Sequence, residues 1–392
     1  LGDVYKRQAV KMKQQIKGSK GKMKIVILIS ILILVLIAAA LIIALPRKGA
    51  ESNEVWTNTE GSFNIDSFAS LDKTENEDFV ILQLSDLQYS GKYPLPEHDS
   101  GISRSKLYDD LIAKIDKAVK ETNPDLIILP GDQVWEYFND VYMKKIGKVI
   151  DSYGIAWAPV FGNHDDEGRA DKNKLGDIME NDFEHCLFKK GPKNITGVGN
   201  YILNIKENDK ILYSVIMLDC GDVKTVNKIP GKYVYPYLDY NQIEWAKWNM
   251  ENISSYEGNK VPSLLVTHQA PYTLRQYYDE RNGENFEAGN ESGIVEVPEN
   301  MGFGKFMEAP GAYADMAGYN NTHWENTAAQ FGTTHIILSH DHINDAVIKL
   351  DGMWYCYGRK VGKYSYSNEE MQGYTTYSIN SSREVKVEHH TF

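Results

Sequence analysis

The chain has 392 residues and a formal net charge of −12, which is divided unevenly along the sequence. Residues 1–48 hold ten Lys or Arg against one acidic residue, whereas the remainder holds 32 basic against 53 acidic residues. A surface with a net charge of −21 repels long polyanions, so nucleic acid is excluded as an expected partner, while a small phosphoester is not. The three cysteines have no close pairing, and the sequence therefore does not indicate a disulfide framework.

The N-terminal region predicts a membrane anchor. Between Ile25 and Leu45 lie 21 residues with Ser30 as the one polar interruption, a length that spans the bilayer core as a helix. We take residues 25–46 as the anchor. Lysines gather before it, so the positive-inside rule places residues 1–24 in the cytoplasm and the chain after residue 46 outside the cytoplasm. We therefore expect a single-pass protein of the cell membrane. A cleaved signal peptide is the alternative, although the apolar run is long for one.

The residues on either side of the anchor have their own character. Leu1–Gln8 lack an initiator Met and resemble translated adapter sequence, so Met12 and Met23 are alternative starts. Residues 47–77 are rich in Glu, Asn, Ser and Thr, and we expect them to tether the anchor to a domain of residues 78–392.

Short apolar runs alternate with amphipathic segments after residue 78, which is typical of an α/β fold. In chain order we expect a strand at 79–84, a helix at 103–120, a strand at 125–129, a helix at 141–150, a strand at 156–161, paired strands at 201–205 and 211–218, a helix at 240–254, and strands at 263–266 and 335–338. The later strands, 346–350, 353–357, 374–379 and 384–388, are interpreted as hairpins of a second sheet. Residues 279–321 are rich in Gly, Asn and Glu, and we interpret them as a lid or, alternatively, a surface insertion.

Five short polar segments follow apolar, strand-like runs, at the positions where an open α/β sheet presents its ligands. They are Asp86-Leu87-Gln88, Gly131-Asp132, Gly162-Asn163-His164-Asp165, His268 and Ser339-His340-Asp341-His342. A pair of metal ions needs oxygen and imidazole ligands and one carboxylate that can bridge the ions. The segments supply these donors, and Asp132 is the natural bridge because its two oxygens can each hold one ion.

The order of these segments resembles the calcineurin-like metallophosphoesterase superfamily, with its pattern D-x-H, G-D, G-N-H-D or G-N-H-E, a lone His and G-H-x-H. The runs Leu218-Asp219-Cys220-Gly221-Asp222, Ile229-Pro230-Gly231 and Tyr355-Cys356-Tyr357-Gly358-Arg359 are similar to its branch of purple-acid-phosphatase-like and yeast cell-cycle phosphatase-like proteins. The resemblance implies a four-layer sandwich of two mixed β-sheets flanked by α-helices. It also implies two divalent or trivalent ions, with Mn, Fe and Zn all open.

The resemblance assigns a role to each site residue. Asp86, His342 and the Gln88 position would hold one ion with Asp132, and Asn163, His268 and His340 would hold the other. His164 would stand near the leaving group as a general acid, for which an imidazole is suited. Asp165 is expected to hold the His164 ring, with an ordinary turn residue as the alternative. Arg359 is expected to contact the substrate phosphate, with a salt bridge as the alternative.

The chain departs from the family pattern in three places. Gln88 stands where the first motif usually has His, and an amide oxygen is a weaker donor than imidazole. Ser339 replaces a Gly, which is a mild change if the local φ is negative. Trp135 stands where purple acid phosphatases have a metal-bound Tyr, so no tyrosinate colour is expected.

The sequence therefore predicts a membrane-anchored, extracytoplasmic, metal-dependent phosphoesterase in which metal-bound water attacks phosphorus, most simply a phosphomonoesterase. One alternative is a phosphodiesterase or nucleotide diphosphatase of the same fold, because some members with Gln at this position act on such bonds. Another is a catalytically weak module that binds phosphorylated ligands. The sequence does not indicate the oligomeric state.

The expected topology can be tested on intact protoplasts that express the chain. Added protease should remove residues 49–392, because the basic flank holds the N-terminal tail inside. Immunoblots against both ends, with a cytoplasmic protein as the control for lysis, report the cleavage. Protection of the domain until the cells are lysed would contradict this topology.

Overall fold

The structure, a computed structural model, describes residues 56–59, 61–91, 101–221, 224–225, 233–234, 238–282, 293–311 and 323–392. Except for Thr225, these residues belong to one compact unit, residues 51–224 and 233–392. The expected tail and anchor, residues 1–46, lie outside the described residues. Within the described ranges, no helix is both long and apolar enough to cross a membrane.

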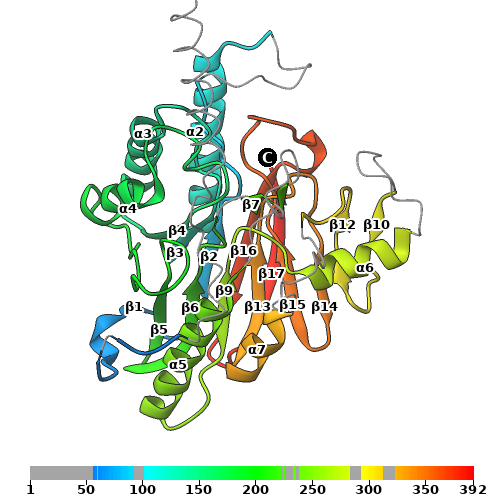
Figure 1. Ribbon diagram of the computed structural model, residues 1–392. Helices are drawn as coiled ribbons and strands as arrows, with labels where there is room; N and C mark the ends of the chain where they lie inside the picture. The colour runs from blue at the N-terminus through cyan, green and yellow to red at the C-terminus, as the bar shows by residue number, and fades with distance from the viewer. Residues whose placement is uncertain are drawn as a thin grey trace, which may run out of the picture. The chain divides into compact units, whose positions relative to one another are not determined.

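A five-stranded mixed sheet carries the first three predicted site segments (Figure 1). Its order is β17 (Val385–Thr391), β16 (Gly373–Ile379), β2 (Phe79–Gln83), β3 (Leu126–Pro130) and β4 (Ala156–Val160). Strands β2, β3 and β4 are parallel neighbours, whereas β16 and β17 add to the β2 edge in antiparallel pairs. The carboxyl ends of the three parallel strands therefore meet at one edge.

An eight-stranded mixed sheet carries the other two site segments. Its order is β1 (Ala69–Asp72), β5 (Tyr201–Glu207), β6 (Lys210–Met217), β9 (Ser263–Val266), β13 (Thr333–Leu338), β15 (Met353–Tyr357), β14 (Val347–Leu350) and β11 (Gly302–Phe303). Strands β6, β9, β13 and β15 are parallel neighbours. The β5–β6 and β14–β15 pairs are antiparallel hairpins, as the sequence predicts.

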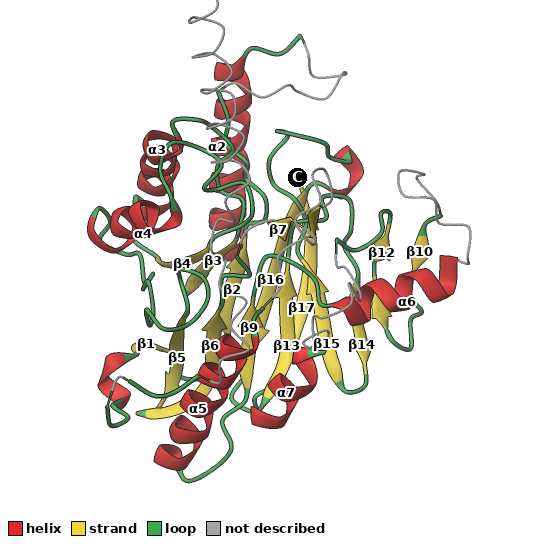
Figure 2. Cartoon of the chain, viewed as in Figure 1, coloured by secondary structure: helices red, strands yellow, loops and turns green. Residues whose placement is uncertain are grey.

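Helices lie on the outside of the two sheets (Figure 2). They are α2 (Arg104–Thr122), α3 (Asn139–Asp151), α4 (Lys172–Asn181), α5 (Tyr240–Glu257), α6 (Tyr272–Asn282) and α7 (Trp324–Phe331), with the short 3₁₀ turns η1 (Ile65–Ser67) and η4 (Glu369–Met371). The remaining strands have two residues each: β7 (Lys224–Thr225), β8 (Tyr233–Val234), β10 (Val295–Glu296) and β12 (Lys305–Phe306).

Two apolar cores explain why the central strands are almost continuously hydrophobic. Successive side chains of a strand point to opposite faces, so a strand buried on both faces feeds two cores. In β6, Val215 and Met217 join the core that contains both sheets and helices α2–α4. Ile216 and the adjoining Leu218 join the other core, under helices α5–α7. The predicted mixed α/β sandwich with helices outside is thereby confirmed.

Helix α2 shows how closely local sequence can define an element. The Ser103 hydroxyl accepts the backbone N–H of Lys106 and caps the first turn. Leu107, Leu111 and Ile115 form its buried face at a spacing of four residues. Asn123 ends the helix with a left-handed φ of 42°, a conformation that Asn tolerates better than most residues.

Two expectations about the elements are wrong, and three helices were not predicted. The four late strands do not form one second sheet, because β14 and β15 join the eight-stranded sheet while β16 and β17 join the five-stranded one. The expected tether is too long, since β1 lies within it and pairs with β5, and Trp56 packs against Trp248. Helices α4, α6 and α7 were not expected, and α6 extends into the segment interpreted as a lid.

The described part of the expected lid is fixed to the fold. Strand β11 pairs with β14 at the end of the eight-stranded sheet, and β10 pairs with β12. The backbone N–H of Gly311 donates to the Asp341 carboxylate, which follows β13. Residues 293–311 therefore pack beside the last site segment, while 283–292 and 312–322 lie outside the described residues.

Candidate metal centre

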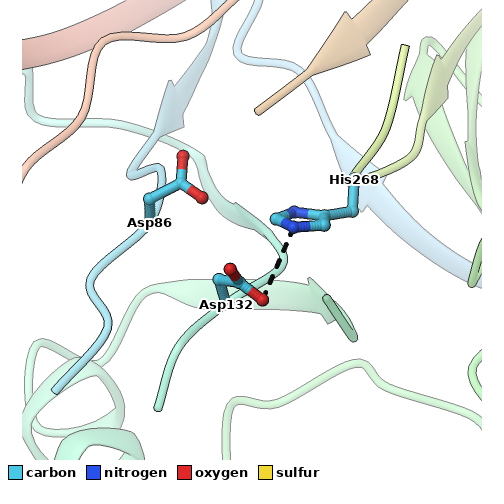
Figure 3. Close-up of side chains that lie close together, drawn as sticks. All are labelled: Asp86, Asp132 and His268. Carbon is cyan, nitrogen blue, oxygen red and sulfur yellow. Dashed lines mark ion pairs between the residues drawn. The ribbon is translucent and has the colours of Figure 1, made fainter. Parts of the chain in front are cut away.

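The two sheets bring carboxylate and imidazole donors together. Asp86 follows β2, Asp132 follows β3, and His268 follows β9 of the other sheet. One ligand atom of each lies within 4.8 Å of the others, and all three side chains are buried. Figure 3 shows Asp86 and Asp132 facing the His268 ring, with an ion pair drawn between His268 and Asp132. Three of the five segments, which are distant in sequence, thus place a donor side chain at one point between the two sheets.

The ligand loops require unusual backbone conformations. Four site residues that are not glycine have a left-handed φ, namely Asp86, Gln88, Asp132 and His340, with φ values of 48°, 42°, 53° and 74°. Such values are uncommon for residues with a Cβ, and they cluster at functional sites. Ser339, which replaces the family Gly, is not among the residues with positive φ, so its substitution is the mild one expected.

Two glycines allow the loops to approach each other closely. A Cβ at Gly162 would lie 2.1 Å from Asp132 Oδ1, and a Cβ at Gly131 would lie 2.3 Å from His268 Nδ1. Gly131 also has a φ of 110°. The glycines of the G-D and G-N-H-D segments are therefore needed for space around the Asp132 carboxylate and the His268 ring.

Asp132 stands at the middle of the centre with both oxygens engaged. Its Oδ1 accepts the backbone N–H of His164 at 3.0 Å and lies 3.4 Å from His268 Nε2. Its Oδ2 accepts a hydrogen bond from Gln88 Nε2 at 3.1 Å. Burial disfavours the carboxylate, but the charges of His268 and His164 outweigh it and hold the pKa of Asp132 well below its usual value.

The hydrogen bonds of His268 select the tautomer that binds a metal. Its Nδ1 lies 2.9 Å from the Pro130 carbonyl oxygen, which can only accept, so Nδ1 carries a proton. The Ser339 hydroxyl lies 2.8 Å from the same nitrogen. In the neutral ring the lone pair is then on Nε2, 3.2 Å from Asn163 Oδ1. In the metal-free protein, burial would lower the pKa of His268, but Asp132 raises it to about 9.

The two histidines after β13 follow the same rule. His340 Nδ1 lies 3.0 Å from Asp341 Oδ1, and His342 Nδ1 lies 3.0 Å from the carbonyl oxygen of Tyr366. Each ring therefore presents Nε2 as its second nitrogen, and that of His342 lies 3.9 Å from Asp86 Oδ1. Metal-binding histidines are usually oriented in this way by an acceptor behind the ring. The residues present fit a metal centre on this ground.

Asp165 has a different role from the one expected. Its carboxylate accepts the backbone N–H groups of Asp132, Gly162 and Val134 at 2.8–3.0 Å, so it fixes two ligand loops instead of the His164 ring. Burial raises the pKa of Asp165 to about 7.

Glu167 is the carboxylate beside His164. Its Oε1 lies 3.1 Å from His164 Nδ1, an ion-pair distance at an angle that makes no hydrogen bond. Its Oε2 accepts from the Trp135 indole at 2.7 Å, and the Trp135 ring lies 4.3 Å from the His164 ring. Trp135 therefore packs against the His164 imidazole. The sequence signal for this arrangement was the Trp at the family Tyr position.

Arg359 binds a carboxylate outside the centre, whereas its neighbour Lys360, to which the sequence assigned no role, reaches the centre. The Arg359 guanidinium donates from Nε and a terminal nitrogen to Asp345 Oδ2, at 3.1 and 2.7 Å, so the salt-bridge alternative describes its contacts. The next residue, Lys360, is the one that reaches the centre. It is 2% exposed, and its Nζ donates to Gln88 Oε1 and to the Asp86 carbonyl oxygen at 2.8 and 3.0 Å.

Comparisons with known proteins agree with this geometry. The sequence profile described as "Calcineurin-like phosphoesterase" matches residues 79–344. Phosphatase DCR2 of Saccharomyces cerevisiae is 26% identical over 313 residues, which cover 74% of this chain and 49% of the yeast protein. The chain thus spans about half the length of that relative. "Probable inactive purple acid phosphatase 28" of Arabidopsis thaliana is 24% identical over 316 residues, which cover 74% of this chain and 71% of the plant protein.

One of the solved structures that the chain matches is a dimetal phosphatase from Danio rerio. It is 10% identical, with a TM-score of 0.45, and the match covers 77% of this chain and 93% of that one. The profile match covers more than half of the chain and includes Asp86, Asp132 and His268, the buried residues that lie together. The chain therefore belongs to the calcineurin-like phosphoesterase family, whose members are metal-dependent hydrolases of phosphoesters.

Proposed function

We propose that this protein is an extracytoplasmic, membrane-anchored phosphoesterase that acts first on phosphate monoesters. The observation that carries the hydrolytic part is the common orientation of His268, His340 and His342. In each ring an oxygen acceptor lies beside Nδ1, which leaves Nε2 as the nitrogen that can bind a metal ion. Three imidazoles arranged in this way around buried carboxylates are costly for folding alone and are explained by cation binding.

The chain's own residues divide the work. Asp86, Asp132, Asn163 and the three histidines would hold the metal ions, which supply charge neutralisation at phosphorus and a more acidic water molecule. Mn, Fe and Zn all suit this mixture of oxygen and nitrogen donors. The backbone N–H of His164 donates to Asp132, so the loop that carries His164 also holds the metal-binding carboxylate in position.

His164 is placed to donate a proton to the leaving oxygen. Its ring is partly exposed, whereas the metal ligands Asp86, Asp132 and His268 are buried, so a substrate can reach it from solvent. Asp132 and Glu167 raise the pKa of His164 against the opposing effect of burial, which favours the proton-bearing form. Trp135 restricts the ring from one side.

A catalytically weak module that binds phosphorylated ligands is the second candidate. The specific observation in its favour is that Gln88, at a metal-ligand position, is hydrogen-bonded on both sides by protein groups. The names of the relatives support both readings, since one is called a phosphatase and another a probable inactive purple acid phosphatase. The apolar run at residues 25–46 supports the membrane location, as argued from the sequence.

Asp132→Asn tests the metal-dependent function. The substitution keeps the size of the side chain but removes the charge that two cations would share. Loss of a residue that only hydrogen-bonds to a metal ligand lowers metal affinity or activity by about 10–100-fold. Because Asp132 would itself bind the ions, we expect a larger fall in metal affinity and in turnover of an aryl phosphate. Metal analysis and initial rates give both readouts.

Asp151→Asn is the matched control for Asp132→Asn. Asp151 also accepts several hydrogen bonds, from the Trp157 indole and from the backbone of Glu184 and His185, but it contributes no ligand atom. It should retain both metal and activity. Full turnover by the Asp132→Asn protein would rule out the proposed centre.

His164→Ala separates proton donation from metal binding. We expect nearly unchanged metal content and a loss of turnover of about 10²–10⁴-fold on substrates with poor leaving groups. The loss should shrink on aryl phosphates with acidic phenols, because these leave without a proton. A Brønsted series on the wild type and the variant measures this, and equal losses along the series would remove His164 from the role.

A further inference from the structure

The orientation of the Gln88 amide is fixed by its two neighbours. Lys360 Nζ lies 2.8 Å from Gln88 Oε1, and a lysine ammonium can only donate. Asp132 Oδ2 lies 3.1 Å from Gln88 Nε2, and an ionised carboxylate can only accept. Reversing the amide would place donor against donor and acceptor against acceptor. The side-chain oxygen of Gln88 therefore accepts the hydrogen bond from Lys360, at a position where the family pattern has an imidazole.

Burial makes this arrangement hard to undo. Gln88 is fully buried and Lys360 is 2% exposed. The Lys360 ammonium donates to Gln88 Oε1 and to the Asp86 carbonyl oxygen. If Gln88 turned its oxygen to a cation, the ammonium would lose the first of these two acceptors. A buried charge that loses a partner is unfavourable, so the protein resists the use of Gln88 as a ligand.

The two halves of the centre are consequently unequal. On the Oδ1 side of Asp132 lie His268 Nε2 and, beside it, Asn163 Oδ1, an imidazole nitrogen and an amide oxygen that could both bind a cation. On the Oδ2 side lies the N–H of Gln88. Lys360 also places a positive charge beside Asp86, whose carboxylate would hold the second cation.

We infer that the centre binds one metal ion tightly and a second one at least about tenfold more weakly. The tight ion is held by Asp132, Asn163, His268 and His340. The weak ion is held by Asp86 and His342 with Asp132, because Lys360 withholds the Gln88 ligand and repels a cation. The occupancy of the second site therefore depends on the concentration of free metal ions. This inference rests on the proposed function, because it requires a metal centre.

The test is stepwise binding of Mn²⁺ to the full chain after removal of metal with a chelator. Calorimetry should give one tight equivalent per chain and one weaker equivalent. Electron paramagnetic resonance should show an isolated Mn²⁺ signal at one equivalent and a spin-coupled signal only as the second is added. Two equivalents of equal affinity, or a coupled signal below one equivalent, would overturn the inference. Absence of any binding would instead overturn the proposed function.

Lys360→Met assigns the asymmetry to its cause. It removes the ammonium, frees Gln88 Oε1 and should tighten the second ion by tenfold or more without changing the first. Gln88→Glu is a second variant that keeps the acceptor for Lys360 and adds an oxygen for the cation, and it should also tighten the second ion. An unchanged second affinity in a folded Lys360→Met or Gln88→Glu protein would contradict the role of this pair.

Lys114→Met is the matched control, since this residue is another buried lysine whose Nζ donates to a glutamine oxygen, that of Gln372, at 2.8 Å. It shares the loss of a buried charge but lies in helix α2. Its two metal affinities should equal those of the wild type. A change in the second affinity as large as that of Lys360→Met would show a general effect of lost stability and would overturn the assignment to Lys360.

Discussion

The structure depends on the confinement of two carboxylates, Asp86 and Asp132, in a space that water barely reaches. Each is 1% exposed, and their charges repel each other. Buried charges of like sign are tolerated only with compensating partners. The protein supplies the positive charges of His268 and Lys360 close to these carboxylates. The rest of the fold can be understood as the means of holding these groups together.

Two sheets are needed because no single strand end can supply all the donors. The five-stranded sheet contributes Asp86, Asp132 and Asn163 from three parallel neighbours, and the eight-stranded sheet contributes the histidines. Buried polar bonds connect the sheets, since Gln83 on β2 donates to the carbonyl oxygen of Leu338 on β13. The strained loops at the sheet edges persist because the strands behind them are rigid.

The ligands could be predicted from sequence because each one follows a strand that is marked by its own apolar pattern. The residues that form hydrogen bonds with the ligand loops, such as Lys360, could not be predicted. Lys360 reaches Asp86 through a parallel bridge between Ser85 and Lys360, a pairing that joins residues 275 positions apart and leaves no local signal. Arg359 carried the better phosphate-binding chemistry, so the sequence indicated Arg359 and gave no reason to single out Lys360.

The same limit explains the other misses. Asp165 and Glu167 are both acidic and both near His164, and only the loop geometry shows which one faces the ring. Hairpin patterns indicated that β14 pairs with β15 and β16 with β17, but long-range pairing decides which sheet each hairpin joins. Strand β1 has four residues with alternating partial exposure, a pattern too short to separate from a tether.

The most direct measurement is the anomalous diffraction of crystals grown with one equivalent of Mn²⁺ per chain. We expect a single strong peak in contact with Asp132, Asn163, His268 and His340, with Gln88 still hydrogen-bonded to Lys360. A peak held by Gln88 and Asp86 instead, or the absence of a peak near Asp132, would contradict it.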